Sequence, residues 1–86
     1  MYSRKKAVAL KYDYGDHAPV VTASGAGVIA DNIIKMAEEH DVPVVFNKEL
    51  TELMSNVKVG DDIPVELYDI AAEVIAFVTR LDQKNK

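Results

Sequence analysis

Cysteine and tryptophan are both absent from this sequence of 86 residues, and none of its apolar runs is long. Without cysteine, neither a disulfide framework nor a thiolate metal site can form. A membrane-spanning helix needs about 20 consecutive apolar residues, and no run approaches that length. The chain starts with basic residues, but the apolar segment Ala7–Leu10 behind them is too short for a signal peptide. We therefore expect a cytoplasmic protein whose core is held by packing alone.

Positive charge is scarce in the body of the chain. Residues 7–82 contain fourteen acidic and five basic side chains, whereas Arg4, Lys5 and Lys6 make the N-terminus basic. An acidic body repels phosphate backbones, which disfavours nucleic acid as the main partner. The basic start could contact an acidic surface, although such ends are more often only solvated.

The composition is that of one small domain. Apolar residues make up 49% of the sequence and charged residues 28%, as is ordinary for a globular protein. A chain of this length builds only one modest core, and it contains no repeat or linker. We expect a basic N-terminal arm over residues 1–6, a single domain over 7–82 and a flexible tail over 83–86.

Two short apolar segments predict a β-hairpin. Ala7–Tyr12 is followed by the turn residues 13–16, which is typical of a strand that enters a loop. Pro19–Ala23 predicts a second strand, with its proline at the start, where the missing N–H does least harm. The two segments are close enough in the sequence to pair.

Three further segments predict helices. The first opens at Ser24–Gly27 and runs to about His40, the second is Lys48–Ser55 with Asn47 as its cap, and the third begins at Pro64. The side chains expected to face inward are Ile29, Ile33, Met36, Ala37 and His40 in the first helix, Leu50, Leu53 and Met54 in the second, and Leu67, Ile70, Ala71, Val74, Phe77, Val78 and Leu81 in the third.

Between the first two helices, Val44–Phe46 is apolar and predicts a buried third strand. Pro43 ends the helix that precedes it. A strand, a helix and a further strand in succession usually form a right-handed parallel crossover. The predicted order β-β-α-β-α-α gives a small α/β domain, with a mixed β-sheet and flanking helices.

No residues are organised for catalysis or for metal binding. His17 and His40 have no second histidine at helical spacing. The adjacent carboxylates Glu38–Glu39 and Asp61–Asp62 do not converge on one point. The segment Ser24–Gly27 matches no phosphate-binding pattern, and no serine lies in a nucleophile turn. We expect no enzymatic activity, no cofactor and no metal.

Several segments share their order and spacing with one protein family. Each is common alone, but together they are specific and cover nearly the whole domain. They are Ala7-Val8-Ala9-Leu10-Lys11-Tyr12-Asp13, Ala18-Pro19-Val20-Val21 with Gly25-Ala26, Ala37-Glu38-Glu39-His40-Asp41-Val42-Pro43-Val44-Val45, and Val59-Gly60-Asp61-Asp62-Ile63-Pro64 with Glu66-Leu67-Tyr68 and Ala72-Glu73-Val74. With these segments the chain resembles the C-terminal domain of the FlhB/YscU-type export-switch proteins of flagellar and type III secretion systems.

The resemblance implies a non-catalytic component or modulator of flagellar or type III protein export. Such a protein would act like the C-terminal fragment that switches the class of exported substrate. The implied partners are the membrane-anchored fragment of an FlhB-type protein and the export substrates. The resemblance also implies recruitment from the cytoplasm to the inner-membrane export gate, without a membrane span in this chain.

The sequence departs from the family at two places. Full-length members carry a membrane domain and cleave themselves within Asn-Pro-Thr-His, a motif that falls on Tyr2-Ser3-Arg4-Lys5 here. Tyr2 has no side-chain amide that could cyclise, so we expect no self-cleavage and a stand-alone counterpart of the fragment after the cleavage site. In the short helix, Glu49-Leu50-Thr51-Glu52 replaces the Pro-Leu-Ala-Arg-like run that is frequent in the family.

The resemblance also indicates an interaction surface. In the family, a strand precedes the cleavage loop and pairs with the strand that follows it. Residues 1–6 are too few and too polar to supply that strand. Val8 to Tyr12 is therefore expected to offer an open edge to a strand of another chain. The partner-binding residues that this implies are Arg4, Lys5, Lys6, Val8, Leu10 and Tyr12.

A second function stays open from the sequence alone. Small RNA-binding α/β proteins of the L7Ae type also have a helix that runs into a Val-Pro-Val-Val-like strand, here Val42–Val45. The acidic body, which has no basic patch with aromatic residues, disfavours that alternative.

Overall fold

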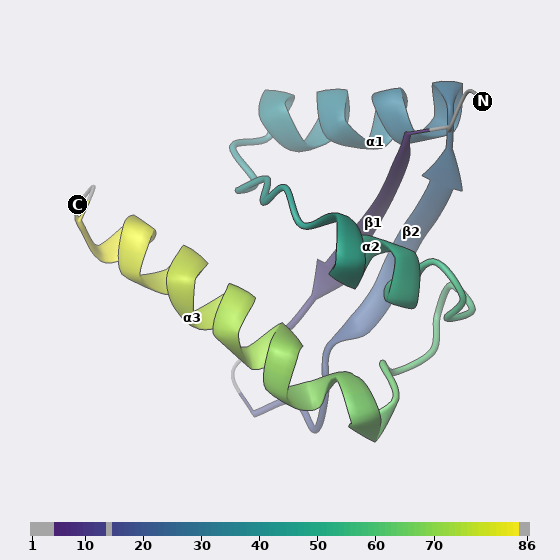
Figure 1. Cartoon of the computed structure of the whole chain (residues 1–86). Helices are drawn as coiled ribbons and strands as arrows, with labels where there is room; N and C mark the ends of the chain where they lie inside the picture. Colours follow the sequence, from purple (N-terminus) through teal and green to yellow (C-terminus); the bar gives the residue numbers. More distant parts are fainter. Residues whose placement is uncertain (1–4, 14, 85–86) are drawn as a thin grey trace.

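The computed structural model describes residues 5–13 and 15–84, apart from the side chains of 77–84. Its elements are β1 (Lys6–Lys11), β2 (Val20–Ala26), α1 (Val28–Glu39), α2 (Lys48–Met54), the 3₁₀ turn η1 (Val65–Leu67) and α3 (Tyr68–Lys84). Figure 1 shows the two strands in the middle, with α1 at the end where β1 begins and α3 at the opposite end. The predicted α/β class is confirmed.

β1 and β2 pair in antiparallel orientation, as predicted. Ala9 lies opposite Ala23 and Leu10 lies opposite Val21, so Thr22 is an extra residue in β2. Such a bulge shifts the alternation of side chains by one position. Val21 therefore faces the same side of the hairpin as Leu10, and its side chain is fully buried.

One face of the hairpin carries small residues and lies against α1. Ala7 and Gly25 are opposite each other on this face. A Cβ at Gly25 would lie 2.8 Å from the Cβ of Ile29, so only glycine permits the close approach of α1. Lys5 adds an ion pair of 3.0 Å with Asp31 of α1.

The other face carries the main core, beneath α2 and α3. Five of its residues are buried and seven half-buried ones pack around them: Val21, Leu50, Met54, Ile63 and Ala71, then Val8, Leu10, Val57, Leu67, Tyr68, Ile70 and Val74. Complete burial of a side chain such as Met54 contributes about 1.5–3 kcal/mol. The predicted cap of α2 is confirmed, because Asn47 accepts a hydrogen bond of 3.0 Å from the Leu50 N–H.

The third strand predicted at Val44–Phe46 is wrong. This segment belongs to no β-ladder, and the side chain of Phe46 is 88% exposed. An apolar segment becomes a strand only where a neighbouring strand offers its hydrogen-bonding groups, and no described segment does so here. In the part of the chain that the structure describes, the sheet therefore consists of two antiparallel strands and has no parallel crossover.

The predicted inward faces of the first two helices are partly wrong. In α1, Ile29 and Met36 are largely exposed, and Ala30 is the residue that is fully buried. The small-residue face of the hairpin lets α1 approach closely, which favours a small side chain at the contact. His40, at the end of α1, is exposed. In α2, Leu53 is exposed as well.

The last helix begins later than predicted. Pro64 has an extended backbone, and the 3₁₀ turn η1 separates it from the start of α3 at Tyr68. Leu67, Ile70, Ala71 and Val74 pack into the core as predicted. The other predicted inward residues of this helix lie outside the described side chains: Phe77, Val78 and Leu81.

Candidate functional site

The outer edge of β2 is closed by the loop that precedes η1. The Val21 N–H donates to the Asp61 carbonyl at 3.0 Å, and the Gly60 N–H donates to the Val21 carbonyl at 2.7 Å. The Ile63 N–H adds a bond of 3.0 Å to the Pro19 carbonyl. Gly60 adopts a φ of 97°, which side chains disfavour and glycine tolerates. Another strand therefore finds no free backbone groups at this part of β2.

No described segment covers the outer edge of β1 in this way. The Gly27 N–H donates to the Lys5 carbonyl at 2.8 Å. In an antiparallel pair, the residues of one strand alternate between those that bond to the partner strand and those that do not. The backbone groups of Lys5, Ala7 and Ala9 therefore face β2. The backbone N–H and C=O groups of Lys6 and Val8 therefore point away from β2. Among the described residues, no hydrogen bond reaches these outward groups. β1 thus presents an open backbone edge.

An apolar segment passes on the open side of β1. Because α1 and α2 lie against opposite faces of the hairpin, their connection must pass around one of its edges. Figure 1 shows this connection on the β1 side. Within the described chain, the backbone of Val44–Phe46 makes no hydrogen bond, and all three of its side chains are exposed. Unpaired backbone and apolar side chains therefore occur on the same side of the hairpin.

The basic residues predicted to bind a partner are not free at this edge. Lys5 pairs with Asp31 at 3.0 Å, and Lys6 pairs with Glu52 of α2 at 3.0 Å. Both lysines therefore hold β1 to the neighbouring helices, through exposed ion pairs that contribute little. Arg4 lies outside the described residues.

The other predicted partner-binding residues lie on or next to β1. Val8 and Leu10 are half-buried, and their side chains pack against the core. Val8 can therefore serve the open edge through its backbone and not through its side chain. Tyr12 follows the strand, is 48% exposed and lines a groove.

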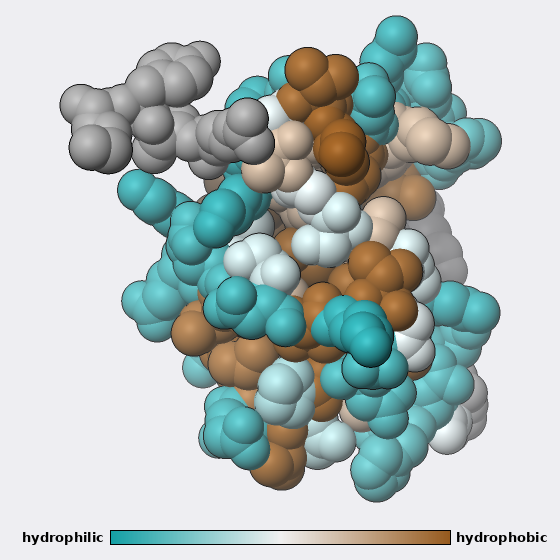
Figure 2. All heavy atoms as spheres, turned by 90° about the vertical axis from the view of Figure 1, so that its right-hand side faces the viewer, coloured by the Kyte–Doolittle hydropathy of each residue, from teal (hydrophilic) through white to brown (hydrophobic). Residues whose placement is uncertain are grey.

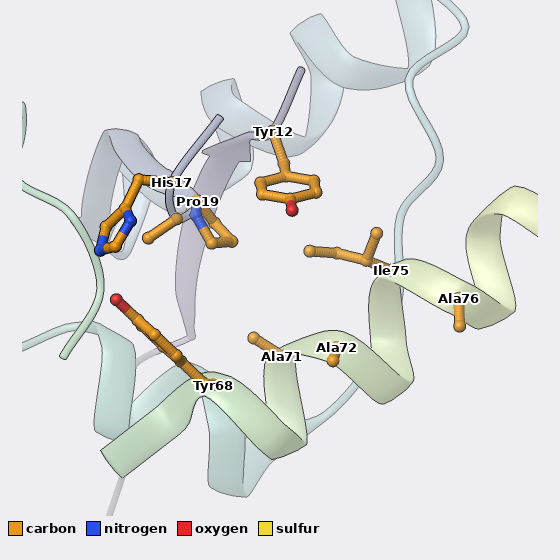
Figure 3. A pocket seen from close by; sticks show the side chains of 9 residues that line it. Tyr12, His17, Pro19, Tyr68, Ala71, Ala72, Ile75 and Ala76 are labelled. Carbon is orange, nitrogen blue, oxygen red and sulfur yellow. The ribbon is translucent and has the colours of Figure 1, made fainter. Parts of the chain in front are cut away.

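This groove, which the sequence analysis missed, has a volume of about 290 Å³. Figure 3 shows Tyr12 and Ile75 on one side of its opening, with His17 and Tyr68 on the other. Ala72 and its neighbours on α3 complete a largely apolar lining. The lining comes from the hairpin and from α3, which are far apart in the sequence, so no local pattern could have revealed it.

The titratable side chains that the structure describes form no cluster at one point. Across residues 5–13 and 15–84, no group of three His, Asp or Glu residues could hold a metal ion. His17 lines the groove, whereas His40 is exposed at the end of α1. Of the helices in the described part of the chain, none has the length and hydrophobicity needed to span a bilayer. In the space-filling view from the β2 side, hydrophobic patches are separated by hydrophilic side chains (Figure 2).

Comparison with known proteins identifies the family. The profile of the FlhB, HrpN, YscU and SpaS family matches residues 4–78. The chain belongs to this family. The resemblance inferred from the sequence is thus confirmed, and membership in the FlhB family favours protein export over the RNA-binding alternative.

Two relatives show how far the similarity to the FlhB family extends. YlqH of Bacillus subtilis is 48% identical over 85 residues, which cover 95% of this chain and 91% of YlqH. The flagellar biosynthetic protein FlhB of Helicobacter pylori is 42% identical over 81 residues, which cover 93% of this chain. The chain spans only 23% of the length of that FlhB.

Solved structures of FlhB-family domains have the same fold. The cytoplasmic domain of FlhB from Shewanella putrefaciens matches with a TM-score of 0.87 and 31% identity, over 93% of this chain and 67% of that one. The C-terminal domain of PscU matches with a TM-score of 0.80 and 27% identity, over 84% of this chain and 94% of that one. The fold of the described chain is therefore that of an FlhB-family C-terminal domain.

Proposed function

We propose that this chain is a non-catalytic component or modulator of flagellar or type III protein export. It acts in the cytoplasm, is recruited to the inner-membrane export gate, and works like the C-terminal switch fragment of an FlhB-type protein. The observation that carries the proposal is the open backbone edge of β1 at Lys6 and Val8. Membership in the FlhB family supports protein export as the setting.

The partner at this edge is a strand of the membrane-anchored fragment of an FlhB-type protein. The outward N–H and C=O groups of Lys6 and Val8 bond to its main chain, which extends the sheet by β-augmentation. Each added backbone hydrogen bond contributes about 0.5–1.5 kcal/mol. Val44 and Val45 supply apolar side chains on the same side. Export substrates are the second class of partner.

The proposal also implies that the chain does not cleave itself. By the resemblance of the following segment to the family, Tyr2 stands where full-length members have the cleaving asparagine. Purified protein should therefore give a single mass after long incubation at neutral and mildly alkaline pH. Specific scission between Tyr2 and Lys6 in the mass spectrum would contradict this part of the proposal.

Amide hydrogen exchange tests the docking directly. The chain is mixed with the purified membrane-anchored fragment of an FlhB-type protein that ends at its cleavage site. We expect the Val8 amide, unbonded in the free chain, to exchange about a hundredfold more slowly in the complex. The Ala9 amide already faces β2 and should change little.

Two variants distinguish edge pairing from other kinds of binding. Val8→Pro removes an outward N–H without taking a bond from the hairpin, so it should abolish binding in a pull-down. Val28→Ala, on the exposed start of α1, serves as the matched control and should bind normally.

The same variants can be examined in cells that lack the C-terminal fragment of the resident FlhB-type protein. There the chain should restore secretion or motility, and Val8→Pro should not. No binding, no protection of Val8 and no restored export would refute the proposal and leave only the family membership.

A further inference from the structure

Phe46 is the most exposed of the large apolar side chains in the described chain, at 88%. It directly precedes Asn47, whose side chain caps α2 through the Leu50 N–H. The backbone next to Phe46 is thus held in place by α2, a capped helix that packs into the core. Exposed aromatic side chains are costly in water and are enriched at the centres of protein interfaces. Phe46 is therefore suited to insert into an apolar pocket of a partner.

The groove beside Tyr12 is suited to receive an apolar side chain of a partner. Its volume is about 290 Å³, and its lining is largely apolar. A dry apolar cavity of about 150 Å³ is enough to bind benzene. The groove can therefore take a phenyl ring, and the rings of Tyr12 and Tyr68 on its two sides (Figure 3) suit edge-to-face contacts with it.

The charges next to the two features are complementary. Asp69 and Glu73 are exposed on α3 next to the groove-lining Ala72, and neither is ion-paired within the described chain. Lys48, two residues after Phe46, is also exposed and has no ion pair among the described residues. Opposite charges that border an apolar contact guide its formation and its orientation.

We propose that Phe46 of one copy of this chain inserts into the groove of a second copy, with Lys48 next to Asp69 and Glu73. Phe46 is not among the residues that line its own groove, so the contact forms between copies. One aromatic side chain buries about 150–250 Å². A stable interface needs roughly 1,000 Å² in total, so the association is weak and depends on concentration. This contact does not depend on the proposed export function.

Sedimentation velocity tests the association between about 10 µM and about 1 mM protein, the range in which weak contacts become populated. We expect the average mass to rise with concentration. Phe46→Ser and Ala72→Asp should each weaken the association at least about tenfold. Both changes are at exposed positions, so circular dichroism should show both variants folded. Val65→Ser removes a different exposed apolar side chain and should associate like the original chain.

Mixing the two defective variants gives the sharper result. The Phe46→Ser chain keeps an intact groove, and the Ala72→Asp chain keeps Phe46. An equimolar mixture should therefore form a one-to-one complex at concentrations where each variant alone is monomeric. A structural defect in either variant would not produce this recovery.

Three outcomes would overturn the self-association. The original chain could remain monomeric at about 1 mM, or Phe46→Ser could associate like the original chain. The mixture could also associate no better than its components. If N-acetylphenylalanine amide binds the groove while the chain stays monomeric, the groove is a site for a different protein segment, and the contact between copies is refuted.

Discussion

Each edge of the hairpin has a connecting segment beside it, but within the described chain only the segment beside β2 forms backbone hydrogen bonds with its strand. At β2, the loop before η1 makes backbone hydrogen bonds through Gly60, Asp61 and Ile63. At β1, Val44–Phe46 is more apolar but makes none within the described chain. Apolar character therefore does not close a sheet edge. The closure depends on a backbone that can turn its N–H and C=O groups toward the strand, as Gly60 does with its positive φ.

The largest expected difference between the two edges comes from proline substitutions. Gly60→Pro removes the N–H that bonds to the Val21 carbonyl and is incompatible with a φ of 97°. It should lower the free energy of unfolding by about 3 kcal/mol or more, and the melting temperature by about 12 °C or more. Val45→Pro breaks no hydrogen bond of the described backbone, so it should cost less than about 1 kcal/mol.

Thermal and urea unfolding of these two variants measure the comparison. Equal losses of stability would show that the segment beside β1 is as firmly bonded as the loop beside β2. That result would also remove the basis for docking at the β1 edge.

A smaller effect is expected where β2 meets α1. Gly25→Ala places a methyl group against the Cβ and Cγ2 of Ile29, so the helix must shift. We expect a loss of about 1–3 kcal/mol, as for other overpacked contacts. The double variant Gly25→Ala, Ile29→Ala should recover part of that loss, because it removes the Cγ2 contact but keeps a Cβ at position 29. Additive losses in a double-mutant cycle would mean that the close approach is not what requires glycine.

The smallest effect is expected at the ion pair between β1 and α2. Lys6 Nζ lies 3.0 Å from Glu52 Oε2, and both side chains are at least a third exposed. A cycle of Lys6→Met and Glu52→Gln should therefore give a coupling energy below about 0.5 kcal/mol. This coupling energy should disappear in about 1 M salt, because dissolved ions screen exposed charges. A coupling several times larger would show that charge fixes β1 to α2 and restricts its edge.

Much of this fold could be predicted because it depends on short stretches of sequence. The hairpin follows from two apolar segments separated by turn residues, and the cap at Asn47 needs only the next three residues. Gly60 could be expected to adopt a positive φ from its place in a polar loop. The family resemblance, too, rests on the order of local motifs, and the family profile confirms it. The division into arm, domain and tail, and the absence of catalysis, stay predictions.

The features that were missed depend on segments that meet only in three dimensions. Val44–Phe46 has the composition of a strand, but a strand exists only where a second backbone supplies donors and acceptors. The buried face of α1 was decided by the small residues opposite it, which leave Ile29 outside and Ala30 inside. The groove joins the hairpin to α3 across most of the sequence. Local composition thus determined which segments could be strands or helices, whereas the available hydrogen-bonding and packing partners decided which groups were left open.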